Sequence, residues 1–172
     1  MKLASNNTAF EGSLPENRVA VTIESTSQLF SILSDSIYSN KILAVIRELS
    51  CNAYDAHIAA GNTEPFQVIL PTRFNPIFSV IDHGTGIHPD KMGDIFWTYG
   101  KSTKTNTNLQ IGALGLGAKS PFAYTKSSYI VKNRWQGKEY TYCCFIGENG
   151  VPNATVLNET ETTESNGITV EL

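Results

Sequence analysis

The order of predicted elements indicates an α+β fold, a two-layer α/β sandwich in which helices cover one face of a mixed, mostly antiparallel sheet. Two helices follow the first predicted strand, and a run of strands joined by short turns ends the chain. This order lacks the regular strand–helix–strand alternation of doubly wound folds. The length of 172 residues fits one core, so we expect residues 1–172 to form a single domain.

The chain begins with a segment that has no hydrophobic period. Residues 1–17 are rich in Asn, Ser, Gly and Pro, and we expect them to form an N-terminal arm. Apolar and polar residues alternate over residues 18–24, which predicts a strand, and apolar side chains recur at helical spacing over residues 26–38. Regular structure is therefore expected to begin after the arm with a strand and a helix.

A long second helix is predicted over residues 41–60, because both of its ends carry capping residues. Asn40 can accept a backbone hydrogen bond as the N-cap, and Gly61 can take the left-handed conformation that ends a helix. Two runs rich in β-branched and aromatic residues follow, at residues 66–70 and 77–81, with prolines between them. We expect both runs to form largely buried, adjacent strands.

The second half of the chain combines short helices, a polar loop and a series of strands. Pro89 can occupy the first turn of a short helix over residues 89–97. Residues 98–110 are polar and aperiodic, and the glycine-dense run that follows should lead into a helix that begins just past Gly117. Four strands are then predicted, at residues 128–133, 140–146, 154–158 and 168–172.

Composition excludes several classes of protein. With 41% hydrophobic and 17% charged residues the chain is too apolar for a disordered protein, and its net charge of −3 gives no overall attraction for nucleic acid. Two of the three cysteines are sequence neighbours, which argues against a disulfide framework and for a reducing compartment. No apolar stretch approaches the length of a membrane span, and no export signal is recognisable, so we expect a cytoplasmic location.

Three polar residues share one side of the long helix. Glu48, Asn52 and Asp55 are spaced i, i+4 and i+7, which places them within a sector of about 60°. This row borders the apolar stripe, so we expect it at the lip of a cleft, although a solvated face would explain such a row by itself. The histidines His57 and His83, by contrast, are expected at polar surface or loop positions without chemistry, as is the third, His88.

Two glycine-rich segments follow. Asp82-x-Gly84-x-Gly86 comes directly after a predicted strand, where a carboxylate could accept a hydrogen bond from an exocyclic amine. The run from Gly112 to Gly117 precedes a predicted helix, and such a junction can bind a phosphate. Taken alone, the first segment is better explained as a plain glycine turn, and the second can be a flexible hinge, but the conjunction is more specific.

Taken together, four motifs in this order resemble the boxes of the GHKL ATPase superfamily: Glu48-x-x-x-Asn52-x-x-Asp55-Ala56, Asp82-x-Gly84-x-Gly86, Ile111-Gly112-x-x-Gly115-x-Gly117 and Gly167-Ile168-Thr169-Val170. Within that superfamily the chain is most similar to the family of phage rapid-lysis (rIIA) proteins, through residues 45–49, 55–57 and 115–122. The resemblance covers nearly the whole chain. It implies the Bergerat fold of this superfamily and a chain that is the N-terminal part of a longer protein.

Residue by residue, the resemblance implies an ATP site. Glu48 would orient and deprotonate the attacking water, and Asn52 would offer its amide oxygen to Mg²⁺. Residues 98–114 would form the ATP lid. The residues implied at the adenine end are Asp55, Ala56, Asp82, Gly84, Gly86, Ile87 and Thr169. Those implied at the phosphates are Lys104, Gly112, Gly115, Gly117, Ala118 and Lys119.

The expected activity is therefore Mg-dependent ATP binding with slow ATP hydrolysis that drives lid closure or dimerisation. Hydrolysis should be weak because some GHKL branches complete the site with a lysine from a following domain. The implied partners are ATP or ADP, a second copy of the chain and a second phage protein near the host membrane, with no direct nucleic-acid binding. A non-enzymatic interaction module that uses ATP only as a conformational switch is the alternative. A P-loop is disfavoured because Ala118 stands where its lysine belongs and Lys119 comes one residue late.

Overall fold

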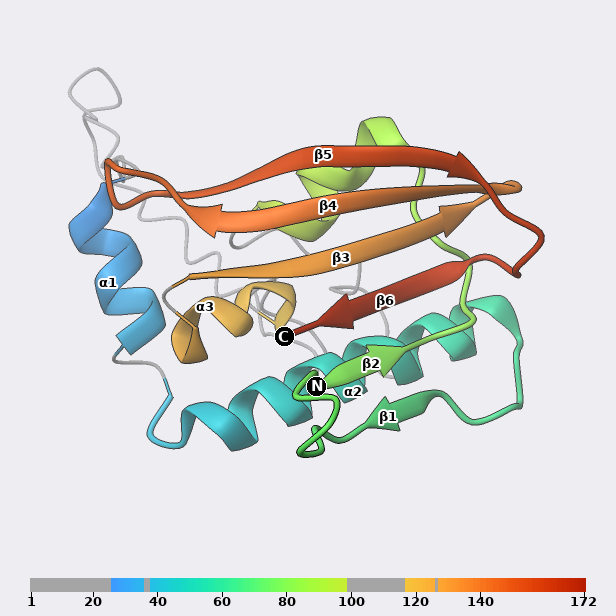
Figure 1. The fold of residues 1–172 in the computed structure, drawn as a ribbon, viewed down its shortest axis with the longest axis horizontal. Coiled ribbons are helices and arrows are strands. Elements are labelled where there is room, and N and C mark those ends of the chain that lie inside the picture. The colour runs from blue at the N-terminus through green and yellow to red at the C-terminus, as the bar shows by residue number, and fades with distance from the viewer. Residues whose placement is uncertain (1–25, 36–37, 99–116, 126) are drawn as a thin grey trace, which may run out of the picture.

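The computed structural model describes residues 26–35, 38–98, 117–125 and 127–172. Six strands of these residues form one sheet in the order β1-β2-β6-β3-β4-β5, and each of its pairings is antiparallel (Figure 1). The strands are β1 Gln67–Ile69, β2 Ser79–Ile81, β3 Ser128–Trp135, β4 Lys138–Ile146, β5 Pro152–Glu161 and β6 Gly167–Glu171. The predicted α+β class with a largely antiparallel sheet is thereby confirmed.

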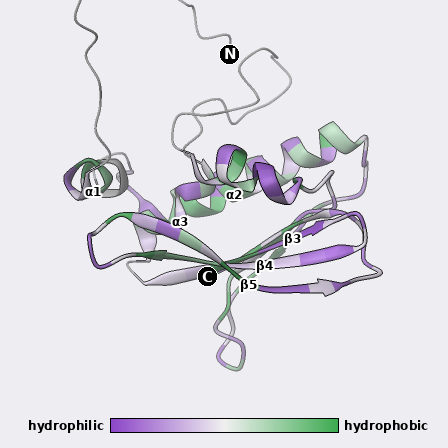
Figure 2. Cartoon of the chain, turned by 90° about the horizontal axis from the view of Figure 1, so that it is seen from above, coloured by the Kyte–Doolittle hydropathy of each residue, from purple (hydrophilic) through white to green (hydrophobic). Residues whose placement is uncertain are grey.

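The helices lie on one face of this sheet (Figure 2). They are α1 Ser27–Asp35, α2 Lys41–Ala60 and α3 Pro121–Tyr124, together with 3-10 turns at Pro89–Lys91 and Gly117–Lys119 and a π-helical turn at Gly93–Trp97. The two predicted caps of α2 are confirmed. Asn40 Oδ1 accepts a 3.0 Å hydrogen bond from Leu43 N, and Gly61 ends the helix at a φ of 64°.

The core lies between α2 and the sheet. Val45, Leu49 and Ala53 come from one side of α2 at helical spacing, and each is at most 4% exposed. They join a cluster to which the central strands contribute Val80, Val131, Val170, Tyr129, Tyr142 and Cys144. This packing holds α2 against the central strands of the sheet.

Two details of the predicted elements are corrected. Within the described residues the first helix spans Ser27–Asp35, and residue 38 is not helical. The helix predicted over residues 89–97 is found with these limits, as a 3-10 turn that continues through Met92 into a π-helical turn. The strand predicted as buried at residues 66–70 is the exposed edge strand β1, where Val68 is 41% and Ile69 40% exposed. Among the described strands it pairs with β2 alone.

Several predicted features lie outside the described residues: the arm at residues 1–17, the strand at residues 18–24 and all of the lid segment 98–114 except Thr98. Within the part of the chain that the structure describes, no helix has both the length and the apolar composition needed to cross a bilayer.

Candidate functional site

The polar row on α2 runs from a partly exposed end to a buried one. The Glu48 side chain is 21% exposed, whereas Asp55 is 1% exposed. Asp55 therefore does not lie at an exposed lip, as the sequence suggests, but within the protein. Glu48 also has a partner that the sequence analysis missed, since Arg47 Nη2 lies 2.7 Å from its Oε1. Only the other carboxylate oxygen, Oε2, remains outside this ion pair.

The last glycine of the third motif lies against this carboxylate. A Cβ atom added to Gly117 would stand 2.8 Å from Glu48 Oε2 and 3.2 Å from Asn52 Nδ2. Both distances are too short for an ordinary contact, so a side chain at residue 117 would displace the two groups. Glycine thus leaves the Glu48 carboxylate and the Asn52 amide in place where the chain meets the polar row of α2.

The second motif places a buried carboxylate at the end of β2. Asp82 is 7% exposed, and its Oδ1 accepts hydrogen bonds from Gly84 N at 2.9 Å and Ile168 N at 3.2 Å. Burial raises the pKa of Asp82 above its ordinary value, and these two hydrogen bonds oppose the rise. Neither bond uses Oδ2, so this oxygen is the one that suits a further donor.

The loop after Asp82 is seated directly on α2. A Cβ atom at Gly84 would lie 2.6 Å from Ala56 Cβ and 2.9 Å from the Ala56 carbonyl oxygen. Ala56 follows Glu48 by eight residues, which corresponds to about 12 Å along the helix axis. The two glycine motifs therefore contact the same helix at two separated points, one beside Glu48 and one beside Ala56.

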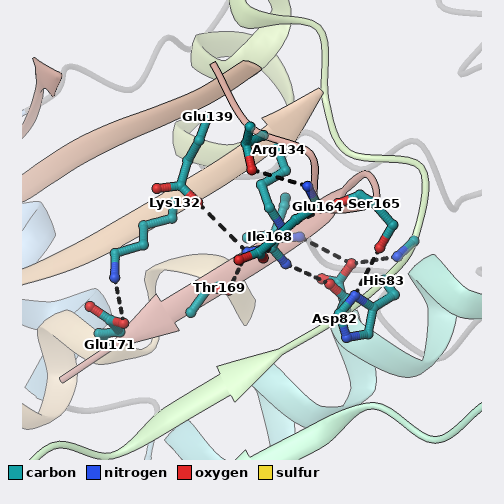
Figure 3. A network of polar contacts seen from close by, with 12 residues as sticks. Asp82, His83, Lys132, Arg134, Glu139, Glu164, Ser165, Ile168, Thr169 and Glu171 are labelled. Atoms are coloured by element: carbon teal, nitrogen blue, oxygen red, sulfur yellow. Dashed lines mark hydrogen bonds and ion pairs between the residues drawn. The ribbon is translucent and has the colours of Figure 1, made fainter. Parts of the chain in front are cut away.

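Thr169 lies beside the end of β2, but its side chain is on the other face of the sheet from the core. Its Oγ1 accepts a 2.9 Å hydrogen bond from Arg134 Nη1 (Figure 3). Its neighbour Val170 belongs to the core beneath the helices, so strand alternation turns Thr169 toward the opposite face of the sheet. The group of β6 that does reach the Asp82 carboxylate is the backbone N–H of Ile168.

Five further residues are predicted at the phosphates. Lys104, Gly112 and Gly115 lie outside the described residues. Ala118 lies in the turn Gly117–Lys119 and packs against the core. Lys119, at the end of the turn that Gly117 begins, is 4% exposed, and burial lowers its pKa to about 8. Lys119 is therefore a buried residue of this region and not a surface lysine.

His57 is a structural residue and not a surface one, contrary to the expectation from sequence. It is 4% exposed, its Nδ1 lies 2.8 Å from Glu64 O, and its Nε2 lies 2.8 Å from His83 N. A backbone N–H can only donate, so Nε2 accepts and the ring proton resides on Nδ1. The one available signal was its position four residues after the buried Ala53.

Protein ligands alone do not make a metal centre here. Across the described ranges, no cluster of three or more His, Cys, Asp or Glu side chains is placed to hold a metal ion. Mg²⁺ commonly takes most of its oxygen ligands from phosphates and water, with only one or two from the protein. One amide oxygen, that of Asn52 beside Gly117, fits such an ion only if a phosphorylated ligand supplies the others.

Comparison with known proteins found no matching family model and no matching curated protein. The motifs and the geometry of the site therefore carry the functional inference.

Proposed function

We propose that the chain is a GHKL-type nucleotide-binding domain that binds Mg-ATP and hydrolyses it slowly. The observation that carries this proposal is the contact of two distant glycine motifs with one helix. Gly117 lies against Glu48 and Asn52, and Gly84 lies against Ala56, about 12 Å further along α2. That separation is comparable to the extent of a nucleoside triphosphate, with its base at one point and its terminal phosphate at the other.

The base end of the proposed site is built around Asp82. Its carboxylate would accept a hydrogen bond from the adenine amino group through Oδ2, because Oδ1 is already bonded to Gly84 N and Ile168 N. Gly84 packs directly on Ala56, so these two small residues let the loop that carries Asp82 sit close to α2. The hydroxyl of Thr169 has no part in this end of the site.

The phosphate end is built around Glu48. A carboxylate within hydrogen-bond reach of a water can orient it and accept its proton, and Oε2 of Glu48 is the oxygen that faces Gly117. Asn52, one turn further along α2, would hold the magnesium ion, which supplies charge neutralisation at the phosphates when bound. Gly117 allows the backbone to approach both groups.

The ion pair between Arg47 and Glu48 favours slow turnover and supports a second candidate function. At 2.7 Å from Oε1, the guanidinium occupies one oxygen of the carboxylate and competes with water for it. A domain in this state binds ATP without efficient hydrolysis. The second candidate is accordingly a module in which ATP acts as a conformational switch, and the rate of phosphate release separates it from an ATPase.

The wider biological proposal rests on the resemblance to phage rapid-lysis proteins. It comprises a host-cytoplasmic location, ATP-dependent dimerisation and a second phage protein near the host membrane as partner. Light scattering with and without a non-hydrolysable ATP analogue tests the dimer directly. An unchanged mass at a saturating analogue concentration contradicts it.

Thermal unfolding with Mg-ATP tests the proposed binding. A ligand present at about one hundred times its Kd stabilises the folded state by about 2.7 kcal/mol, so the melting temperature should rise. Asp82→Asn should weaken this effect, whereas Glu48→Ala should retain it and lose phosphate release. Asp90→Asn is the matched control, because its carboxylate is 91% exposed. An unshifted melting temperature in the wild-type protein, or full turnover in Glu48→Ala, contradicts the proposal.

A further inference from the structure

Two neighbouring residues of β3, Asn133 and Arg134, hold the two ends of the Asp82–Ile87 loop. Adjacent residues of a strand point to opposite faces of the sheet, so these side chains approach the loop from different sides. Asn133 is 0% and Arg134 3% exposed. Neither residue belongs to a motif that the sequence analysis singled out.

Asn133 fixes the far end of the loop. Its Oδ1 accepts a 3.0 Å hydrogen bond from Ile87 N, and its Nδ2 donates a 2.7 Å hydrogen bond to Ile87 O. One side chain thus satisfies both backbone groups of one residue, as a neighbouring strand would. The adjacent Gly86, at a φ of 65°, packs against the Arg134 carbonyl so closely that no Cβ fits there.

Arg134 fixes the near end. Its Nη2 donates to Asp82 O at 3.1 Å, its Nη1 to Thr169 Oγ1 at 2.9 Å and its Nε to Ser165 O at 3.2 Å (Figure 3). The planar guanidinium therefore joins the residue that carries the buried carboxylate to β6 and to the turn before it. Glu164 and Glu139 lie 3.5 Å and 3.9 Å from the same group and offset its charge.

We propose that Asn133 and Arg134 are positioning residues that make the site select adenine over guanine, an inference that rests on the proposed function. Guanine carries a carbonyl oxygen where adenine carries its amino group, and a fixed carboxylate oxygen repels that carbonyl. A mobile carboxylate would turn away and lose this discrimination. Selectivity therefore depends on how rigidly the Asp82 loop is held.

Further hydrogen bonds to the middle of the loop are independent of β3. His83 N donates to His57 Nε2 at 2.8 Å, and Asn62 Nδ2 donates to His83 O at 3.0 Å. Both partners come from α2 or the residues just after it. Loss of the hydrogen bonds from Asn133 or from Arg134 should therefore loosen one end of the loop, while the rest of the loop stays bound to α2.

The test compares Arg134→Lys and Asn133→Ser with the wild-type protein. A lysine keeps the charge but cannot reach three acceptors, and a serine is too short to make both bonds to Ile87. Lys132→Gln is the matched control, because Lys132 lies on the same strand and pairs with Glu171 at 2.8 Å, away from the loop. Binding of Mg-ATP and Mg-GTP is measured by calorimetry, and amide exchange by NMR in the nucleotide-free proteins.

We expect the ratio of ATP to GTP affinity to fall about tenfold in both variants, which is the effect of losing about one charge-assisted hydrogen bond. Exchange of the Gly84 amide should accelerate in Arg134→Lys and that of the Ile87 amide in Asn133→Ser, while the control matches the wild type. A merely structural role would weaken both nucleotides equally. If the folded variants keep the wild-type ratio of ATP to GTP affinity, or if their amide exchange is unchanged, the inference about Asn133 and Arg134 is wrong while the proposed function stands. A wild-type protein that binds neither nucleotide overturns the proposed function and the selectivity role with it.

Discussion

Replacing glycine by alanine should impair hydrolysis but not stability at Gly117, and should impair stability at Gly84. At Gly117 the new Cβ would meet the ends of two flexible side chains, 2.8 Å from Glu48 Oε2 and 3.2 Å from Asn52 Nδ2. At Gly84 it would meet Ala56, 2.6 Å from its Cβ and 2.9 Å from its backbone carbonyl. Side-chain ends can rotate away, but a helix backbone cannot.

The expected changes in stability follow from this difference. Replacing glycine by alanine in a compatible conformation stabilises by about 0.4–1 kcal/mol through the unfolded chain, which offsets the displacement of Glu48 and Asn52 in Gly117→Ala. We therefore expect the free energy of unfolding of Gly117→Ala to stay within about 1 kcal/mol of wild type. Overpacking that forces the backbone to move costs about 1–3 kcal/mol, and Gly84→Ala should lose that amount.

The rate of ATP hydrolysis, in contrast to stability, should be affected strongly by Gly117→Ala. In Gly117→Ala the Glu48 carboxylate and the Asn52 amide move away from the phosphate end, and a misplacement of about 1 Å can lower a rate about a hundredfold. Urea unfolding gives the stability of both variants, and phosphate release gives the rate. A Gly117→Ala protein that hydrolyses ATP like the wild type, or that loses several kcal/mol of stability, refutes the reasoning about this contact.

Three further predictions concern buried polar groups. Burial lowers the pKa of Lys119 from 10.5 to about 8, so the unfolded chain binds a proton that the folded one lacks between these values. The Lys119 contribution to the free energy of unfolding should therefore rise with pH across that window, so urea titrations should show the wild-type protein gaining stability relative to Lys119→Met. His57→Phe leaves two backbone groups without their partner and should lower the free energy of unfolding by about 2 kcal/mol, as measured in urea. Thr169→Val removes one acceptor of Arg134. It should lower the affinity for ATP, measured by calorimetry, less than Asp82→Asn does. If both variants lost the same affinity, the Thr169 hydroxyl would contact the adenine after all.

The features that the sequence predicts well are those set by local interactions. The helix over residues 41–60 has the predicted limits because Asn40 and Gly61 each satisfy backbone groups of the adjoining turn. The four strands after residue 128 are also found, with limits that differ by at most three residues, because each run is rich in β-formers and ends at a turn. The short turn between β3 and β4 illustrates this, with Gly137 at a φ of 78°.

The features that the sequence predicts poorly depend on pairings between distant residues. The prediction that residues 66–70 are buried is wrong because composition does not reveal that β1 stands at the edge of the sheet that the described strands form. His57 resembles a surface residue until the Asp82 loop is placed beside it. Arg134 carries no local signal, since its three acceptors come from segments 31 to 52 residues away.

The orientation of Thr169 also depends on pairing between distant residues and could not be predicted from its motif. A motif in the sequence identifies a strand, but the register of that strand against its neighbours decides which residues face the site. Here Val170 pairs with Val80 and Val131, and all three belong to the core. The adjacent residue Thr169 must therefore face the other side of the sheet. A shift by one residue would exchange the two roles, which is why the mutation of Thr169 is informative.

The arrangement on α2 makes the two halves of the proposed site separable by experiment. Glu48 and Ala56 belong to one rigid helix, and eight residues turn the helix by about 80° beyond two full turns, so both remain on one side. The chain meets this side at Gly117 and at Gly84 through segments that are far apart in sequence. Changes at the first contact should therefore act on phosphate release, and changes at the second on nucleotide binding. If Gly117→Ala abolished binding of Mg-ATP as completely as Asp82→Asn, the two ends would not be independent, and a single nucleotide spanning them would no longer explain the spacing.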